Sequence, residues 1–279
     1  MPILLSTAAF AFHGSVENPA VVMDAVDGVR DELDGIDLFI FIDDSWDMAP
    51  LPGGFLEWLG SFGLVSFHLS MAHPYDAGED GRDLPGNVLD AVAGAMRRTG
   101  CRDLTIHADC FARDGEGLLQ LIKNSCDCRL ALELMDATRA FGNRVEHCMP
   151  LMASHPDLGM VPDLAHLDEM RHVASPAETF EALAGRIRYV HGSLSGGRVA
   201  AEVQVHWYSR RDVRHVPAVL GGGDVIEDLA GLAVGYPLIL EGAVPKGAAG
   251  LQLLRDEIRW WSLAQGRGQA LVVGTVESG

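Results

Sequence analysis

The feature that most constrains the fold is a regular alternation of short apolar segments, rich in β-formers, with longer amphipathic segments. This alternation is typical of βα units, in which a parallel sheet is covered by helices. Eight strands, each followed by a helix, predict one α/β domain closed into a (β/α)8 TIM barrel. The predicted strands are residues 3–9, 36–42, 64–68, 104–107, 130–133, 160–163, 187–191 and 237–241, and the helices are 19–33, 54–62, 85–99, 116–124, 143–154, 176–184, 225–234 and 247–263.

The doubly wound open sheet shares this alternation but is disfavoured by the first predicted turn. It requires a glycine-rich turn after the first strand, whereas residues 8–13 read Ala-Ala-Phe-Ala-Phe-His. A length of 279 residues and a hydrophobic content of 48% suit a single barrel over residues 1–279. Residues 193–223 are longer than an ordinary loop, and 200–208 alternate in polarity, which predicts a hairpin insertion over the barrel mouth. Gly221 to Gly223 could cradle phosphate, although a flexible turn is the favoured interpretation.

Acidic residues are in strong excess: 39 Asp and Glu face 21 Lys and Arg, a formal net charge of −18. Because this field repels nucleic acid and anionic membranes, we expect a small-molecule substrate and no nucleic-acid or membrane partner. The first residues carry no basic signal region, and no apolar run reaches the roughly 18 residues needed to cross a bilayer. We therefore expect a cytoplasmic protein.

The cysteines are odd in number, which suits reduced thiols. Cys126-x-Cys128 could form half of a metal site, but no second pair accompanies it, so ordinary thiols are favoured. The five are Cys101, Cys110, Cys126, Cys128 and Cys148.

Six predicted strands end in a side chain that can bind a metal. In a barrel the carboxyl ends of all strands face one cavity, so residues far apart in the sequence converge there. One histidine at a strand end is more often a hydrogen-bonded rim residue, but six such ends predict a site. Imidazole and carboxylate ligands suit zinc, manganese, cobalt or iron. The six residues are His68, His107, Glu133, Asp163, His191 and Glu241.

Two further histidines could extend this site. His166 follows Asp163 by three residues and could reach the metal or the substrate, or could belong to the cap of the next helix. His215 could fold over the mouth from the long loop before the last helix, or be an exposed loop residue. The other histidines divide into candidate substrate contacts (His13, His73, His206) and expected surface residues (His147, His155, His172).

The order of these residues resembles the xylose isomerase-like superfamily of TIM barrels, which includes sugar-phosphate isomerases, keto-sugar epimerases and the endonuclease IV family. The resemblance covers nearly the whole chain, most clearly from the third strand onward. It is carried by His68 with His73-Pro74-Tyr75, His107, Glu133, Asp163-x-x-His166, His191, His215-x-Pro217 with Gly221 to Asp224, and Leu240-Glu241.

Resemblance to the epimerase branch implies one divalent ion held by Glu133, Asp163, His191 and Glu241. In that branch the ion polarises a substrate carbonyl and hydroxyl, while two glutamates move a proton through an enediolate. Glu133 and Glu241 would be this acid-base pair. Arg198, one position from where the branch has a substrate-binding arginine, and His73 are weaker candidate substrate contacts.

Resemblance to the endonuclease branch implies three zinc ions with additional ligands, which His68, His107, His166 and His215 match. An aspartate expected two residues before the loop histidine is replaced by Val213, with Asp212 one position away. That branch would also need basic residues at the mouth, for which Arg210, Arg211 and Arg214 are candidates.

The predicted function is therefore a divalent-metal-dependent isomerase or epimerase of a sugar or sugar-like small molecule. The alternative is an endonuclease IV-like multinuclear zinc phosphodiesterase or hydrolase. The additional histidines favour the alternative, whereas the acidic charge and the replaced aspartate favour the isomerase. One ion (Mn, Zn, Co or Mg) is expected rather than two or three, and the resemblance also suggests a homo-oligomer.

Overall fold

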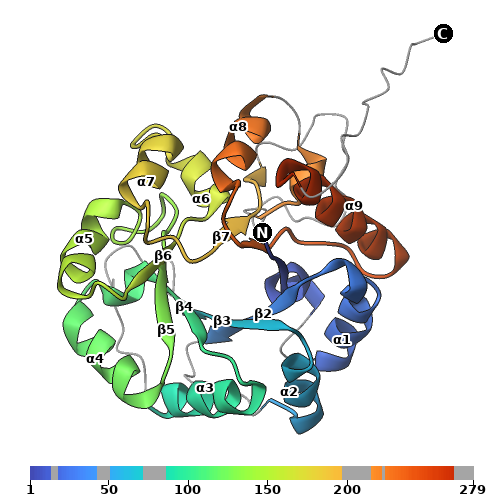
Figure 1. Ribbon diagram of the computed structural model, residues 1–279, viewed down its shortest axis with the longest axis horizontal. Coiled ribbons are helices and arrows are strands. Elements are labelled where there is room, and N and C mark those ends of the chain that lie inside the picture. The colour runs from blue at the N-terminus through green and yellow to red at the C-terminus, as the bar shows by residue number, and fades with distance from the viewer. Residues whose placement is uncertain (14–17, 43–50, 72–85, 197–214, 222–223, 267–279) are drawn as a thin grey trace.

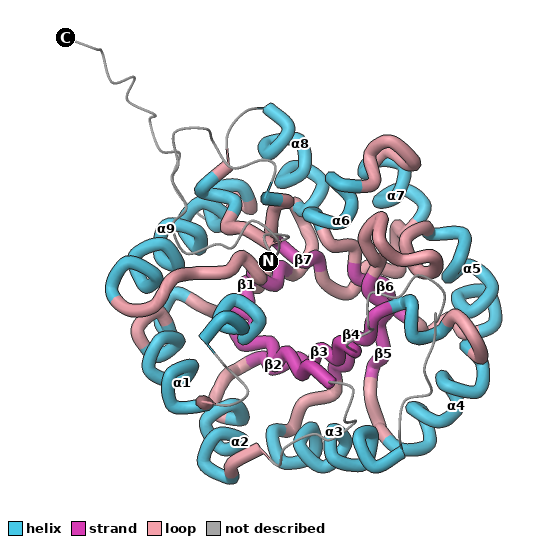
Figure 2. The backbone as a smooth tube through the Cα atoms, turned by 180° about the vertical axis from the view of Figure 1, so that it is seen from behind, coloured by secondary structure: helices cyan, strands magenta, loops and turns pink. Residues whose placement is uncertain are grey.

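Eight parallel strands form a ring that is surrounded by helices in the computed structural model (Figure 1). The structure describes residues 1–13, 18–42, 51–71, 86–196, 215–221 and 224–266. Strands follow the order β6-β5-β4-β3-β2-β1-β8-β7. Two isolated parallel bridges, Met160 to Ile187 and Asp163 to His191, connect the two ends of this order and close the ring. The predicted TIM barrel is confirmed, and Figure 2 shows the strands inside the ring of helices from the opposite side.

The strands are β1 (Ile3–Ser6), β2 (Gly35–Ile42), β3 (Leu64–Met71), β4 (Asp103–His107), β5 (Arg129–Glu133), β6 (Gly159–Val161), β7 (Val190–Gly192) and β8 (Leu238–Leu240). The α-helices are α1 (Pro19–Asp27), α2 (Gly53–Gly60), α3 (Gly86–Thr99), α4 (Gly115–Ser125), α5 (Val145–Ser154), α6 (Leu164–Glu169), α7 (Pro176–Ala182), α8 (Asp224–Ala233) and α9 (Ala248–Ala264). Short 3-10 helices include η1 (Thr7–His13), η2 (Arg30–Glu32), η3 (Ala108–Phe111) and η5 (Ala218–Leu220).

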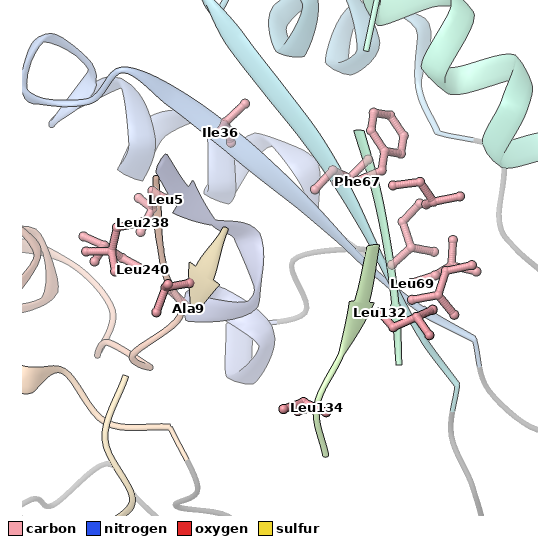
Figure 3. Close-up of a cluster of buried hydrophobic side chains, with 14 of the residues drawn as sticks. Leu5, Ala9, Ile36, Phe67, Leu69, Leu132, Leu134, Leu238 and Leu240 are labelled. Carbon is pink, nitrogen blue, oxygen red and sulfur yellow. The ribbon is translucent and has the colours of Figure 1, made fainter. Parts of the chain in front are cut away.

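Side chains alternate between the two faces of the barrel wall, as the period of a β-strand requires. Outward-facing aliphatic residues pack with the helices into the main core; Figure 3 shows Leu69 and Leu132 in one group and Leu5, Leu238 and Leu240 in another. Inward-facing Leu4, Ala131, Val161, Tyr189 and Ile239 form a separate buried cluster inside the barrel. Helices cover the outer face of each strand and the barrel interior buries the inner face. The strand sequences are therefore mostly apolar, with polar residues at a few inward positions.

Several predicted boundaries were wrong for local reasons. β1 stops at Ser6 because η1 begins at Thr7, where the Ser6 hydroxyl accepts a hydrogen bond from the Ala8 amide. Helix α6 was missed: Asp163, predicted as the end of a strand, caps it by accepting a hydrogen bond from the His166 amide. α1 ends at Asp27 rather than continuing to residue 33, and the short helix η2 occupies part of the predicted continuation.

Several predictions fall on parts of the chain that the structure does not describe. The predicted hairpin insertion is one of them, because residues 197–214 lie outside the described residues. The same holds for His73, Arg198, His206, Arg210, Arg211, Asp212, Val213 and Arg214. Leu194 and Val216, on either side of residues 197–214, form an isolated antiparallel bridge. Within the described ranges, no helix is long and apolar enough to span a membrane.

Candidate metal centre

Three of the predicted strand-end residues lie inside the barrel, on strands that do not neighbour one another. His68 on β3, Glu133 on β5 and His191 on β7 are each 1% exposed or less. The ring nitrogen Nε2 of His68 lies 2.7 Å from Glu133 Oε2, and Nδ1 of His191 lies 3.3 Å from Glu133 Oε1. These side chains meet because each occupies an inward position near the carboxyl end of its strand.

Asp163 and Glu241 complete this group from the segments that follow β6 and β8. His191 Nδ1 lies 3.3 Å from Glu241 Oε2 and 3.8 Å from Asp163 Oδ2. One ligand atom from each of Glu133, Asp163, His191 and Glu241 lies within 4.8 Å of the others. The structure thus brings together the four residues that were predicted to hold one ion.

The chemistry of these atoms fits a divalent cation. Asp163 Oδ2 and both ring nitrogens of His191 are buried and make no hydrogen bond to the described residues. His68 Nε2 and Glu133 Oε2 lie 2.7 Å apart but are not aligned as a hydrogen bond. Buried polar atoms normally have partners, and an ion is one accepted explanation where they do not. Mixed imidazole and carboxylate ligands suit zinc, manganese or cobalt.

Three further candidate residues, His107, His166 and His215, also lie at this site. His107 Nε2 is 3.3 Å from Glu133 Oε2, and His215 Nδ1 is 3.6 Å from Asp163 Oδ2. Asp163, His166 and His215 form a second group whose ligand atoms approach within 4.8 Å of one another. His166 Nδ1 also approaches the Leu134 carbonyl at 2.8 Å, so it has a structural partner besides any ligand. His68, Glu133 and His191 make a third such group.

Opposite charges lower the pKa values of Glu133 and Glu241 and raise those of His68 and His191. Burial raises the pKa of Glu133, but His191, His68 and His107 together bring it well below its usual value. Burial lowers the pKa of His68, but Glu133 and Glu241 outweigh this and raise it to about 10. His191 behaves similarly, with its pKa well above the usual range. Protons on the histidines and a divalent cation serve the same electrostatic role, because both neutralise the carboxylates.

A cavity of about 210 Å³ opens above these side chains. Its described lining includes His68, His107, Glu133, His166, His215 and Glu241, together with Ala8, Phe39, Ser70, Met135, Asp136, Arg139 and Ala243. Sequence reasoning missed Asp136 and Arg139. Their position directly after the fifth strand was the available signal, since the loops at that end of a barrel carry function.

A buried carboxylate beneath the cluster was also missed. Asp37, on β2, is completely buried and accepts hydrogen bonds from the hydroxyls of Ser6 and Ser66. Burial raises its pKa, although His68 and His191 oppose the shift. Asp37, His68 and Glu241 form another group with ligand atoms within 4.8 Å. A single charged residue inside the apolar run of residues 36–42 was the sequence signal.

Of the histidines expected at the surface, His172 is exposed, but His147 and His155 are half-buried. His147 accepts a hydrogen bond from the Gly142 amide and stacks on Phe141, and His155 pairs with Glu116 at 2.7 Å. The side chain of His13 lies outside the described residues. Cys126 is buried and Cys128 half-buried, and no group of potential metal ligands among the described residues contains a cysteine.

The fold matches solved barrels of low sequence identity over nearly their whole length. An L-ribulose 3-epimerase aligns over 100% of this chain and 99% of its own, with a TM-score of 0.65 and 14% identity. The chain has the fold of the xylose isomerase-like TIM barrels.

Two other barrels of this superfamily show the same likeness. Endonuclease IV from Thermus thermophilus aligns over 94% of this chain and 98% of its own, with a TM-score of 0.61 and 18% identity. D-psicose 3-epimerase from Clostridium cellulolyticum aligns over 96% and 98%, with a TM-score of 0.58 and 11% identity. No family model and no curated protein matches the sequence. At these identities, what the xylose isomerase-like barrels share with this chain is the fold.

Glu257 fixes the segment that follows His215. On α9, this carboxylate is 1% exposed and accepts hydrogen bonds from the Ala218 amide (2.7 Å), the Val219 amide (2.8 Å) and the Trp261 indole (2.9 Å). It thereby ties η5 to α9. Burial raises the pKa of Glu257 to about 7, against the opposing effect of the three donors.

This pKa predicts a pH-dependent contribution to stability. Between the usual value of 4.5 and about 7 the folded chain holds a proton that the unfolded chain has released, so the free energy of unfolding falls as pH rises through this window. The full effect is on the order of 3 kcal/mol. The test is the free energy of unfolding, measured by urea denaturation from pH 5 to 8 for the wild type and for Glu257→Gln, whose amide does not titrate. As pH rises, the value for the wild type should fall relative to that of the variant. A difference that is constant with pH would contradict the shift.

Proposed function

We propose that this chain is a divalent-metal-dependent isomerase or epimerase that moves a proton on a sugar or sugar-like small molecule. The observation that carries the proposal is the pair Glu133 and Glu241. Both are buried, both line the cavity, and each lies 3.3 Å from the same atom, Nδ1 of His191. Two carboxylates on either side of one bound substrate can remove a proton and return it.

In this proposal Glu133, Asp163, His191 and Glu241 hold one divalent ion, which would polarise the carbonyl of the substrate. The chain's own groups do the rest. One of the two glutamates accepts the proton from the carbon next to the carbonyl, and the other supplies a proton to the resulting enediolate. Burial of both carboxylates limits competition from water.

Solvent isotope exchange tests the proposal. The manganese-loaded protein is incubated in D₂O with a panel of ketoses and their phosphate esters. The deuterium content of the recovered sugars is then measured by mass spectrometry. We expect one carbon-bound deuterium in the product, with no incorporation by Glu241→Gln. The absence of deuterium with every member of a panel of C4 to C6 ketoses, from protein shown to hold metal, would contradict the proposal.

The second candidate is a multinuclear zinc hydrolase. The specific observation in its favour is the additional group Asp163, His166 and His215, together with His68 and His107 beside Glu133. A hydroxide held between two ions needs more ligands than one Lewis acid does. Cleavage of bis(p-nitrophenyl) phosphate by the zinc-loaded protein, without deuterium exchange on any ketose, would favour this candidate.

A further inference from the structure

Arg139 brings a positive charge to the cavity above the metal centre. Its side chain is 20% exposed, and it lines the cavity together with Glu133 and His215. Among the described lining residues it is the one Arg or Lys. A guanidinium is always charged and presents its donors in a planar fork that matches carboxylate or phosphate oxygens.

The loop that carries Arg139 is fixed in place. Its base is closed by a hydrogen bond from the Met135 amide to the Gly142 carbonyl (3.0 Å), and the Asn143 side chain donates to the Arg139 carbonyl (2.5 Å). Gly142 has a φ of +80°, and a Cβ there would lie 2.8 Å from Ala108. The loop is therefore pressed against η3 at a position that only glycine fits. An arginine on such a loop is preorganised for a ligand.

Arg139 contacts η3 through only one of its three guanidinium nitrogens, Nε. Nε of Arg139 lies 3.4 Å from Oδ2 of Asp109, a buried carboxylate. This contact orients the group, and neither terminal nitrogen of Arg139 donates a hydrogen bond to the described part of the chain. Those two nitrogens are the donors that a cavity ligand can use.

We propose that Arg139 forms an anion subsite, and that the substrate is a small molecule bearing a phosphate or carboxylate group. This inference rests on the proposed function, because it names the substrate class of the same cavity. The strongly acidic chain would otherwise repel such a molecule. Arg139 supplies a local positive charge beside the two glutamates, so the anionic group lies at one side of the cavity and the reacting carbons lie over Glu133 and Glu241.

Anion binding to the full chain tests the subsite directly. Inorganic phosphate and acetate are titrated by calorimetry into the metal-loaded protein in an anion-poor buffer, for the wild type, Arg139→Gln, Arg139→Lys and the control Arg259→Gln. Arg259 is an exposed residue of α9 that lies outside the cavity lining. We expect Arg139→Gln to weaken the preferred anion about tenfold or more, Arg139→Lys to weaken it less, and the control to leave it unchanged.

The comparison separates the subsite from a purely structural role in neutralising Asp109. In that role Arg139→Gln would lower the melting temperature and leave anion affinity equal to that of the wild type, and this result overturns the proposal. Should Arg139→Gln fail to fold, Arg139→Lys decides, because it keeps the charge beside Asp109 but loses the fork; unchanged affinity again overturns the proposal. Preference for phosphate over acetate assigns a phosphate ester, and the reverse assigns a carboxylate.

The isotope experiment can refute either the anion subsite or the proposed isomerase activity without refuting the other. Deuterium exchange on uncharged ketoses with no dependence on Arg139 would uphold the isomerase and refute the subsite. Arg139-dependent phosphate or acetate binding without any exchange would uphold the subsite and refute proton transfer.

Discussion

The Glu133→Gln variant is expected to lose bound metal and catalytic activity together. Glu133 contacts His68 at 2.7 Å and His107 and His191 at 3.3 Å, so it is the carboxylate that the cluster shares. The amide has nearly the same size but no negative charge, so the variant loses a ligand and the proposed acid-base group at once. General acid-base catalysis alone contributes roughly 10²- to 10⁴-fold, so we expect at least about a thousandfold loss of deuterium exchange.

Metal content per chain is measured by elemental mass spectrometry on protein purified without chelator or affinity metal. Glu227→Gln is the matched control, because Glu227 is an exposed residue of α8. The control should retain metal and activity. Retention of one ion per chain by Glu133→Gln, with exchange within tenfold of the wild type, would remove Glu133 from both roles. A wild-type chain that holds no metal after incubation with manganese, cobalt or zinc would end the metal hypothesis itself.

The double variant His166→Ala, His215→Ala is expected to keep the same metal count as the wild type, one ion per chain. In the proposed isomerase the ion is held by Glu133, Asp163, His191 and Glu241. His166 on α6 and His215 would then contact substrate rather than the essential ion. Activity should fall through weaker substrate binding. In the hydrolase alternative, the same change would remove two of the three residues of the second group, and the count would fall by at least one.

His172→Ala is the matched control for this experiment, because His172 is exposed on the segment after α6. Both proteins are titrated with zinc and manganese by calorimetry and then analysed for bound metal after dialysis. Two or three ions in the wild type, falling in the double variant but not in the control, would replace the isomerase with the multinuclear hydrolase. An unchanged count of one would support the single-ion site.

The fold and the centre of the site could be predicted from sequence because both follow from short-range rules. A parallel strand buried on both faces must be apolar, so a polar residue at its end stands out, as in the segments ending at His68, His107 and Glu133. In a closed barrel all such ends share one cavity. Two facts, strand polarity and barrel closure, were therefore enough to place residues from six strands around one centre.

The sequence by itself determined the barrel and the candidate histidines and carboxylates at the predicted strand ends, since strand period and strand polarity act over a few residues. Only the tertiary structure decided that Asp37 lies close to His68, that Glu257 ties η5 to α9, and that Arg139 faces the cavity. The last of these depends on Gly142 packing against Ala108 and on Asp109 meeting the guanidinium. Such contacts join segments far apart in the chain, and no local pattern encodes which loop will lie over which strand end.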